Sequence, residues 1–522
     1  MKVGNTQSRF PTGAKLVGCV KVCDRIVHSS FSYPTTPCKG EDSMLRPILF
    51  FVALALAYWS AHSVHADTRP NIVVLLCDDL GYGDLQCYGH PHIKTPNLDK
   101  LADSGIRLTD FYSAAPVCSA SRVGLLTGRS PNRAGVYDWI PQATTPKPDA
   151  RDQVHMRADE ITIPHLLRQA GYSTCLAGKW HCNSRFNSPA QPQPGNFGFD
   201  HWLATQNNAA PSHKRPQNFV RNGEPLGEVD AFSCQFVVDE AIGWLDTVDH
   251  DKPFFLYIPF HETHEPVASP ESLVAQYRGV ARNDDEAQYF ANVANVDNAV
   301  GRLLETLTQR HLRDNTLIIF SSDNGPETLA RYQGATRCYG TPGGLRGMKL
   351  HTTDGGFRVP GIVNWPARIQ TGQVVSTPIS SLDFLPTFCE LAGADSPTGV
   401  SLDGTSFLTV LDGHELIREK PLVWAYYNAT NQSRVAMRDG KWKVLAKLDG
   451  GRLPKMQNIT SESLPIVADA QLTDFEIYDL SVDAAEAHDL SGEQPAQAQR
   501  LAEKLKVSYF ELVANSHVWQ PR

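Results

Sequence analysis

The sequence predicts an α/β fold: a large, mostly parallel central sheet flanked by helices, followed by a smaller C-terminal α+β subdomain. Two observations predict it. Up to about residue 420, short and nearly continuous apolar runs alternate with segments of helical periodicity. Past residue 420 the pattern changes to a hairpin, a further strand and one amphipathic helix. We therefore expect two domains, 67–420 and 421–522.

The apolar runs are expected to be strands, and the segments between them helices. The runs are short and do not alternate, which is typical of strands buried on both faces of a parallel sheet. They span 71–77, 172–177, 253–259 and 316–320. The helical segments span 97–105, 163–171, 236–248 and 286–312. This alternation places helices on both faces of the sheet.

Two further segments complete the predicted fold. The C-terminal part begins with a hairpin at 433–446 around Asp439-Gly440, and continues with a strand at 475–480 and a helix at 496–513. In the first part, the Pro-rich stretch from Asn187 to Pro216 is expected to be a substrate-facing loop.

The first 66 residues are expected to lie outside the folded protein. Residues 44–66 have a charged start, an apolar run and a small-x-small site, which together describe a signal peptide cleaved after Ala66. We therefore predict that Met44 is the true start, that 1–43 is a mis-called extension, and that the protein is secreted or periplasmic. An internal membrane anchor is the alternative, although the apolar run is short for a membrane span. After cleavage we expect no stable membrane span.

The composition excludes some classes of protein. A net charge of −8 gives no basic field for nucleic acid. Three of the 11 cysteines precede Ala66, and the remaining eight are few for so long an exported chain, so it is not a disulfide scaffold.

Polar residues follow each predicted strand. Asp78-Asp79 follows the first, Lys179 and His181 the second, His261 to His264 the third and Asp323-Asn324 the fourth. In open α/β sheets, ligands bind beyond the carboxyl ends of the strands. The oxygens of Asp78, Asp79, Asp323 and Asn324 would suit a hard cation such as Ca²⁺ or Mg²⁺.

Cys118 opens a predicted helix, with Arg122 four residues on and Gly124-Leu-Leu-Thr-Gly-Arg129 after it. Helix-start amides and an arginine stabilise negative charge there. The stretch Cys118-Ser-Ala-Ser-Arg122 resembles the type I (formylglycine-dependent) sulfatase signature, in its less common Cys-x-Ala-x-Arg form. The chain is similar to arylsulfatases and N-acetylgalactosamine-6-sulfatases of the alkaline-phosphatase-like superfamily, through five ordered motifs between Arg69 and Pro366.

The resemblance implies a metal site and a modified nucleophile. Asp78, Asp79, Asp323 and Asn324 match the family's calcium ligands, and an oxygen of the modified Cys118 side chain joins them; we expect Ca²⁺ in preference to Mg²⁺. Cys118 would be oxidised to formylglycine (3-oxoalanine) by a formylglycine-generating or anaerobic sulfatase-maturating enzyme. The hydrated formylglycine would then form a covalent sulfated intermediate.

The resemblance also assigns the remaining catalytic residues. Arg122, Lys179 and Lys349 would neutralise the sulfate oxygens, and His181 would contact the nucleophile. His264 would protonate the leaving oxygen; His261 is its rival, which periodicity does not exclude. Asp354 replaces the family's usual Glu in the segment after Lys349.

Sulfate ester hydrolysis is the function that these residues predict, with a sulfated carbohydrate as the substrate. Two alternatives stay open at this point. One is a phosphodiesterase or phosphonate monoester hydrolase of the same superfamily, and the other is a non-catalytic protein that binds sulfated glycans. Subsite residues are expected in the variable loops at 183–216, 265–282 and 331–344.

Overall fold

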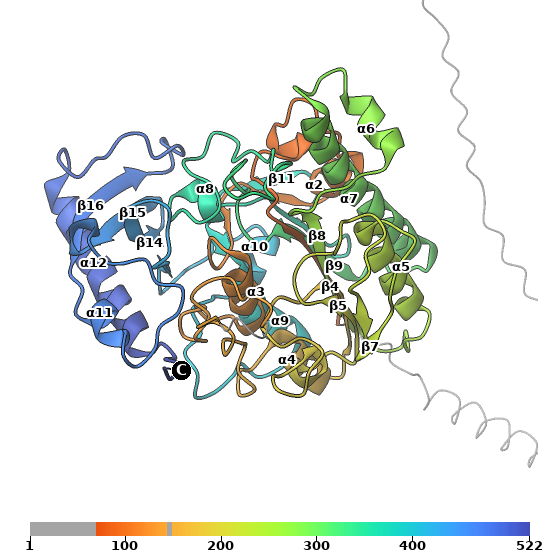
Figure 1. The fold of residues 1–522 in the computed structure, drawn as a ribbon, viewed down its shortest axis with the longest axis horizontal. Coiled ribbons are helices and arrows are strands. Elements are labelled where there is room, and N and C mark those ends of the chain that lie inside the picture. Colours follow the sequence, from red (N-terminus) through yellow and green to blue (C-terminus); the bar gives the residue numbers. More distant parts are fainter. Residues whose placement is uncertain (1–68, 144–148, 522) are drawn as a thin grey trace, which may run out of the picture. The chain divides into compact units, whose positions relative to one another are not determined.

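The structure is a computed structural model that describes residues 69–143 and 149–521 (Figure 1). The predicted extension 1–43, the signal peptide 44–66 and the cleavage site after Ala66 lie outside these residues. Among the helices that the structure describes, none combines the length and the apolar character needed to cross a membrane.

The larger sheet has ten strands in the order β11-β2-β10-β9-β1-β8-β4-β5-β6-β7. Its central strands β9, β1, β8, β4 and β5 run parallel, whereas β10 and β6 pair antiparallel with their neighbours. The strands are β1 (Asn71–Asp78), β2 (Ile106–Leu108), β4 (Ser173–Lys179), β5 (His201–Thr205), β6 (Val220–Arg221), β7 (Glu224–Pro225), β8 (Phe254–Thr263), β9 (Thr316–Ser322), β10 (Gly361–Asn364) and β11 (Gln373–Val375). The short strands β3 (Phe111–Tyr112) and β12 (Ile379–Ser380) form a separate pair.

Helices cover both faces of this sheet, because its central strands are buried on both sides. Along β1, Ile72, Val74 and Leu76 belong to a core with α3, α4 and α9, whereas Val73 and Leu75 belong to a second core with α2, α5 and α7. Successive side chains of a strand point to opposite faces, which explains the division. The helices are α2 (Pro96–Asp103), α3 (Cys118–Thr127), α4 (Ile163–Gln169), α5 (Ser233–Leu245), α6 (Glu271–Tyr277), α7 (Asp284–Gln309), α8 (Asp354–Phe357), α9 (Phe384–Ala392) and α10 (Leu408–Leu411).

The structure confirms the predicted fold class and its main elements. The four apolar runs are β1, β4, β8 and β9, and the four helical segments are α2, α4, α5 and α7. The prediction of a loop from Asn187 to Pro216 was wrong in its middle, where β5 forms a buried strand paired with β4. This strand has only five residues, too few for a clear apolar run to show between the flanking prolines.

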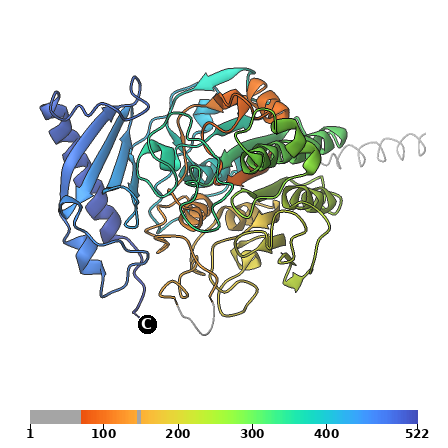
Figure 2. The same ribbon diagram turned by 45° about the horizontal axis from the view of Figure 1, so that its top comes forward.

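The C-terminal segment forms a second, antiparallel sheet of four strands in the order β13-β14-β15-β16. The predicted hairpin is β14 and β15, the predicted strand is β16, and α12 packs on the sheet through Leu501, Leu505 and Tyr509 (Figure 2). The elements are β13 (Leu422–Ala425), β14 (Ser433–Asp439), β15 (Trp442–Leu448), α11 (Leu464–Ala468), β16 (Leu472–Asp479) and α12 (Pro495–Ala514). The boundary at 420/421 stays a prediction.

A buried lysine joins the second sheet to the loop that carries Lys349. Lys443 on β15 contacts Asp354 of α8 at 2.7 Å and Glu486 at 3.3 Å, and all three side chains are buried. Its ammonium also lies 4.2 Å from the ring centroid of Phe357. Asp354, the residue that departs from the family pattern, thus has a cationic partner and accepts a further hydrogen bond from Tyr112.

We expect Lys443→Met to destabilise the protein by about 3–5 kcal/mol, because it leaves the buried Glu486 without its ion pair and leaves Asp354 with only a longer contact to Arg358, at 3.4 Å. Urea unfolding of the full chain, followed by fluorescence, measures the change. The matched control is Lys441→Met, two residues away, since its 2.6 Å contact with Asp479 is made by a side chain that is 53% exposed. That variant should change stability by no more than about 1 kcal/mol. Equal effects of the two substitutions would contradict this account of Lys443.

Candidate active site

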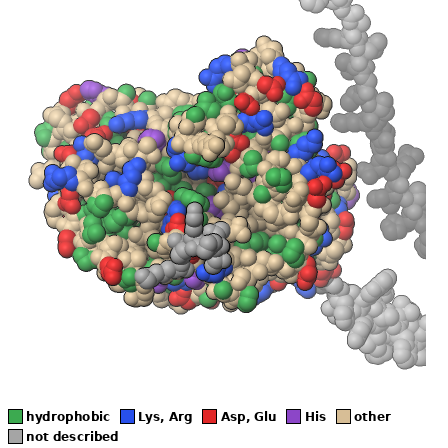
Figure 3. Space-filling view, in the orientation of Figure 1, with side chains coloured by type: hydrophobic (Ala, Val, Ile, Leu, Met, Phe, Trp, Pro, Cys, Tyr) green, Lys and Arg blue, Asp and Glu red, His purple; other side chains and the backbone are tan. Residues whose placement is uncertain are grey.

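The predicted site residues lie together at the carboxyl ends of the parallel strands. Asp78 and Lys179 are the last residues of β1 and β4, Asp323 and Asn324 follow β9, and His264 follows β8. Because these strands are parallel, their exits meet at one edge of the sheet. Figure 3 shows Lys, Arg and His side chains gathered around a hollow near the middle of one face.

One glycine lets two of the strands approach closely next to the site. Gly178, before Lys179, has φ +140°, and a Cβ built on it would lie 1.9 Å from the carbonyl oxygen of Pro259 on β8. Any larger residue would therefore push β4 away from β8 and displace Lys179.

Cys118 is the first residue of α3, as predicted, and its side chain is buried. Burial raises the pKa of its thiol to about 11, although Lys179 and Lys349 lower it. At neutral pH this side chain is therefore a thiol and not a thiolate. The unmodified cysteine is a poor nucleophile here, because the thiolate is the reactive form.

The acidic residues and Cys118 form one compact cluster. One ligand atom each of Asp78, Cys118 and Asp323 lies within 4.8 Å of the others. Asp79 joins them through its backbone N–H, which donates to Asp323 Oδ1 at 3.2 Å, and through Oδ1, which accepts from Asn324 Nδ2 at 2.7 Å.

Two buried oxygens of this cluster fit a metal ion. Asp78 Oδ1 and Asn324 Oδ1 have no hydrogen-bond partner among the described residues. Buried carboxylate and amide oxygens are normally satisfied, and a hard cation is a partner that binds both. The predicted ligands Asp78, Asp79, Asp323 and Asn324 therefore fit a divalent cation.

Three buried cations surround the carboxylates. Lys179 Nζ lies 2.5 Å from Asp78 Oδ2, and Lys349 Nζ lies 2.7 Å from Asp79 Oδ2. Arg122 contacts Asp323 Oδ2 through Nε at 2.9 Å and Nη2 at 2.7 Å. The predicted cations thus all lie beside predicted metal ligands.

The histidines differ in where they lie. His181 lines the pocket, and its Nε2 donates to the carbonyl oxygen of Ile140 at 3.0 Å. Its pKa is lowered, mainly by burial and secondly by the positive charge of Lys179. His264 also lines the pocket, and its Nε2 lies 3.6 Å from Asp79 Oδ2. His261 is instead buried in β8, where its Nε2 contacts Thr205 Oγ1 at 2.8 Å and its ring packs on Phe219. Of the two histidines considered as proton donors, His264 lines the pocket and His261 does not.

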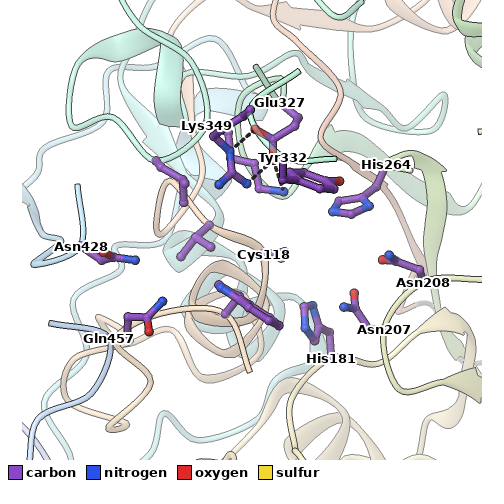
Figure 4. A pocket seen from close by; sticks show the side chains of 14 residues that line it. Cys118, His181, Asn207, Asn208, His264, Glu327, Tyr332, Lys349, Asn428 and Gln457 are labelled. Atoms are coloured by element: carbon purple, nitrogen blue, oxygen red, sulfur yellow. Dashed lines mark hydrogen bonds and ion pairs between the residues drawn. The ribbon is translucent and has the colours of Figure 1, made fainter. Parts of the chain in front are cut away.

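A pocket of about 430 Å³ opens onto Cys118 (Figure 4). Cys118, His181, His264 and Lys349 are the predicted catalytic residues among those that line it. Its walls include side chains that the sequence analysis did not assign: Trp139, Asn207, Asn208, Glu327, Arg331, Tyr332, Asn428 and Gln457.

Comparisons with known proteins agree with this geometry. Residues 70–394 match the family model described as Sulfatase, and residues 349–448 match the model described as N-sulphoglucosamine sulphohydrolase, C-terminal. The chain belongs to the sulfatase family. It is therefore a sulfuric ester hydrolase.

Curated and solved relatives support this membership over most of the chain. Arylsulfatase A of Homo sapiens is 33% identical over 464 residues, which cover 84% of this sulfatase and 86% of that protein. N-acetylgalactosamine-6-sulfatase of Homo sapiens is 35% identical over 377 residues, 69% of each chain. The crystal structure of Ps i-CgsB in complex with k-i-k-neocarrahexaose has a TM-score of 0.71 at 27% identity, over 87% of this chain and 95% of that one.

Glu327 is a lining residue of this sulfatase that the sequence analysis missed and that lies beside a predicted residue. It follows Asp323-Asn324-Gly-Pro, and its carboxylate accepts hydrogen bonds from Arg331 at 2.6 and 2.7 Å. Lys349 Nζ lies 3.6 Å away. Burial raises the pKa of Glu327, but Arg331 and Lys349 outweigh burial and hold that pKa at about 2. Its position after a strand-exit motif was a usable signal.

The other missed residues come from distant segments. Asn207, Asn208, Arg331 and Tyr332 fall within two of the three loops that the sequence predicted, while 265–282 contributes none of the described lining residues. Asn428 and Gln457 follow strands of the second sheet, and no catalytic or substrate-binding motif marks them.

We expect His264→Ala to lower kcat about 10²–10⁴-fold on an alkyl sulfate such as a sulfated sugar, and much less on nitrophenyl sulfate. A sugar alkoxide needs a proton to leave, whereas nitrophenolate leaves without one. Steady-state kinetics on both esters measure the split.

The control for His264 is His261→Gln. Because His261 is buried away from the pocket, this variant should lower the thermal midpoint and affect the two esters alike. If His264→Ala reduced turnover of both esters equally, the assignment of His264 as proton donor would be wrong.

Proposed function

We propose that the protein hydrolyses sulfate esters of a sulfated carbohydrate, with a formylglycine made from Cys118 as the nucleophile and a bound Ca²⁺, in preference to Mg²⁺, at Asp78, Asp79, Asp323 and Asn324. The observation that carries the proposal is the cluster in which Cys118 lies within 4.8 Å of two carboxylates that suit a hard cation. A thiol is a poor ligand for such a cation, and an oxygen at the same position is a good one.

The chemistry of position 118 supports the modification. A thiol with a raised pKa gives little thiolate at neutral pH, so the unmodified residue suits neither the metal nor the attack on sulfur. When present, the hydrated formylglycine and the metal would supply an oxygen nucleophile and a Lewis acid for the sulfate.

The protein's own side chains would meet the remaining demands of the reaction. Lys179 and Lys349 lie beside Asp78 and Asp79, where their charges would stabilise the negative oxygens of the sulfate. Arg122 holds Asp323 in place through two contacts to one oxygen. His181 fixes its ring on the carbonyl oxygen of Ile140, and its Nδ1 has no hydrogen-bond partner among the described residues. His264 would give the leaving oxygen its proton.

A carbohydrate substrate is supported by the relatives and by the pocket. Ps i-CgsB is solved with a neocarrahexaose, and N-acetylgalactosamine-6-sulfatase is named for a sulfated sugar. The walls of the pocket are rich in side-chain amides, which hydrogen-bond hydroxyl groups.

Parallel assays on sulfate, phosphate diester and phosphonate aryl esters test the proposal. The protein is produced together with a formylglycine-generating or anaerobic sulfatase-maturating enzyme, and conversion of Cys118 is measured by peptide mass spectrometry. We expect kcat/KM to be highest on the sulfate ester. A preference for the phosphate or phosphonate ester would favour the hydrolase alternative, and binding of sulfated glycans with no turnover would favour a non-catalytic protein.

We also propose that the protein is exported through the signal peptide at 44–66 and acts as a secreted or periplasmic enzyme. N-terminal sequencing of the exported protein should give Asp67 as its first residue. An N-terminus upstream of Met44 in the mature protein would contradict both the cleavage after Ala66 and the mis-called extension 1–43.

A further inference from the structure

We infer that the pocket selects a sugar on which the reacting sulfate is the sole charged group, and that it disfavours a second sulfate or a carboxylate on the same sugar. This inference rests on the proposed function and names the substrate class within it.

The cations that line the pocket are already paired. Among the described lining residues, Lys349 and Arg331 are the only lysine and arginine side chains. Lys349 Nζ lies 2.7 Å from Asp79 Oδ2, and Arg331 donates one hydrogen bond to each carboxylate oxygen of Glu327. Beyond the place where the reacting sulfate would bind, the described walls thus offer an anion no unpaired positive charge.

Glu327 neutralises Arg331 on the same wall. Both of its oxygens accept hydrogen bonds from Arg331, and one also accepts from the backbone N–H of Thr328. This arrangement holds the carboxylate in its ionised form. An anionic substituent placed near this ion pair would lose hydration without gaining an unpaired cationic partner.

The flanks of the pocket suit neutral, hydroxylated groups. Asn207 and Asn208 lie on one side of Cys118, and Asn428 and Gln457 lie on the other (Figure 4). Each primary amide both donates and accepts hydrogen bonds, as a hydroxyl does, and carries no charge. A sugar held over Cys118 would therefore find partners for its hydroxyls in both directions.

Two aromatic rings complete this surface. Tyr332 is 37% exposed and Trp139 is 36% exposed, and both line the pocket. Exposed aromatic rings offer an apolar face to the C–H face of a sugar. They add to binding without favouring a charged substituent.

The test compares matched pairs of sulfated sugars with the matured enzyme. Each pair shares a ring and linkage, and one member carries a single sulfate while the other carries a second sulfate or a uronic carboxylate. We expect kcat/KM to be at least about tenfold higher on the singly charged member. Nitrophenyl sulfate serves as the reporter of sulfate ester hydrolysis itself.

Charge substitutions in the flanks sharpen the test. Gln457 is exposed in the pocket wall, so Gln457→Lys introduces a cation and Gln457→Met is its uncharged control. Asn208→Lys does the same on the opposite flank. At least one lysine variant should raise the relative kcat/KM on the doubly charged sugar about tenfold, whereas Gln457→Met should leave the ratio unchanged.

The outcomes separate this inference from the proposed function. Turnover of nitrophenyl sulfate with equal or better kcat/KM on the doubly charged sugars overturns the inference alone. The inference is also overturned if neither lysine variant raises kcat/KM on the doubly charged sugar relative to the singly charged one. It is overturned as well if every singly sulfated sugar is neither hydrolysed nor able to compete with nitrophenyl sulfate. Loss of all turnover, nitrophenyl sulfate included, would instead overturn the proposed function.

Discussion

We expect the Cys118→Ala variant to lose sulfate ester turnover by at least about 10⁴-fold, because alanine cannot be converted into an oxygen nucleophile. The fold should survive, since the substitution removes one sulfur atom from the start of α3 and costs about 1 kcal/mol or less in packing. Hydrolysis of nitrophenyl sulfate and the thermal midpoint are measured on the same preparation.

The matched control is Cys389→Ala. Cys389 is also a buried, unpaired thiol on a helix, but it packs in the apolar core around α9. The Cys389→Ala variant should retain turnover and lose only a little stability. Undiminished activity in Cys118→Ala, or equal losses in the two variants, would show that position 118 does not supply the nucleophile.

The Asp323→Asn variant should lose both its metal and its activity. Mutation of a residue that only supports a metal ligand typically weakens metal affinity by about 10–100-fold, and removing a negative charge from a ligand itself should weaken it more. We expect turnover to fall by about 10³-fold as a result. Elemental analysis after dialysis measures metal content, with about one Ca²⁺ per chain expected in the parent protein. Chelation should abolish activity of the parent, and added Ca²⁺ should restore it.

Asp323→Asn also weakens the buried ion pair between Arg122 and Asp323, so a control for lost stability is needed. Asp297→Asn provides it, because Asp297 is a buried carboxylate of α7 that accepts hydrogen bonds from the backbone of Asn97 and Leu98. That variant should be destabilised yet keep its metal. Full metal content in Asp323→Asn would argue against Asp323 as a ligand.

Much of the fold was predictable because its strongest signals are local. The runs at β1, β4, β8 and β9 are apolar enough to be read as buried strands, and parallel strands bring their exits together. This is why the sequence alone places Asp78, Lys179, His264 and Asp323 at one edge of the sheet. The short strand β5 gives no such signal, and the sequence therefore predicts a loop there.

The walls of the pocket were harder to predict, because they depend on contacts between distant segments. Asn428 and Gln457 reach the pocket only because the second sheet packs beside the first, an arrangement fixed in part by Lys443 and Asp354. Which of His261 and His264 lines the pocket likewise depends on the path of the backbone at the end of β8. Sequence spacing alone carries neither piece of information.

The pocket draws its floor from one sheet and part of its rim from the other. Lys179 and His264, which would act on the sulfate, lie at the ends of central strands, and Cys118 opens the buried helix α3, so changes near them disturb the core. Asn428 and Gln457 sit in connections of a separate sheet, which tolerate insertions and exchanges far better. Changes in these connections could therefore alter which polysaccharide the enzyme accepts, while the residues that carry out sulfate ester hydrolysis stay the same.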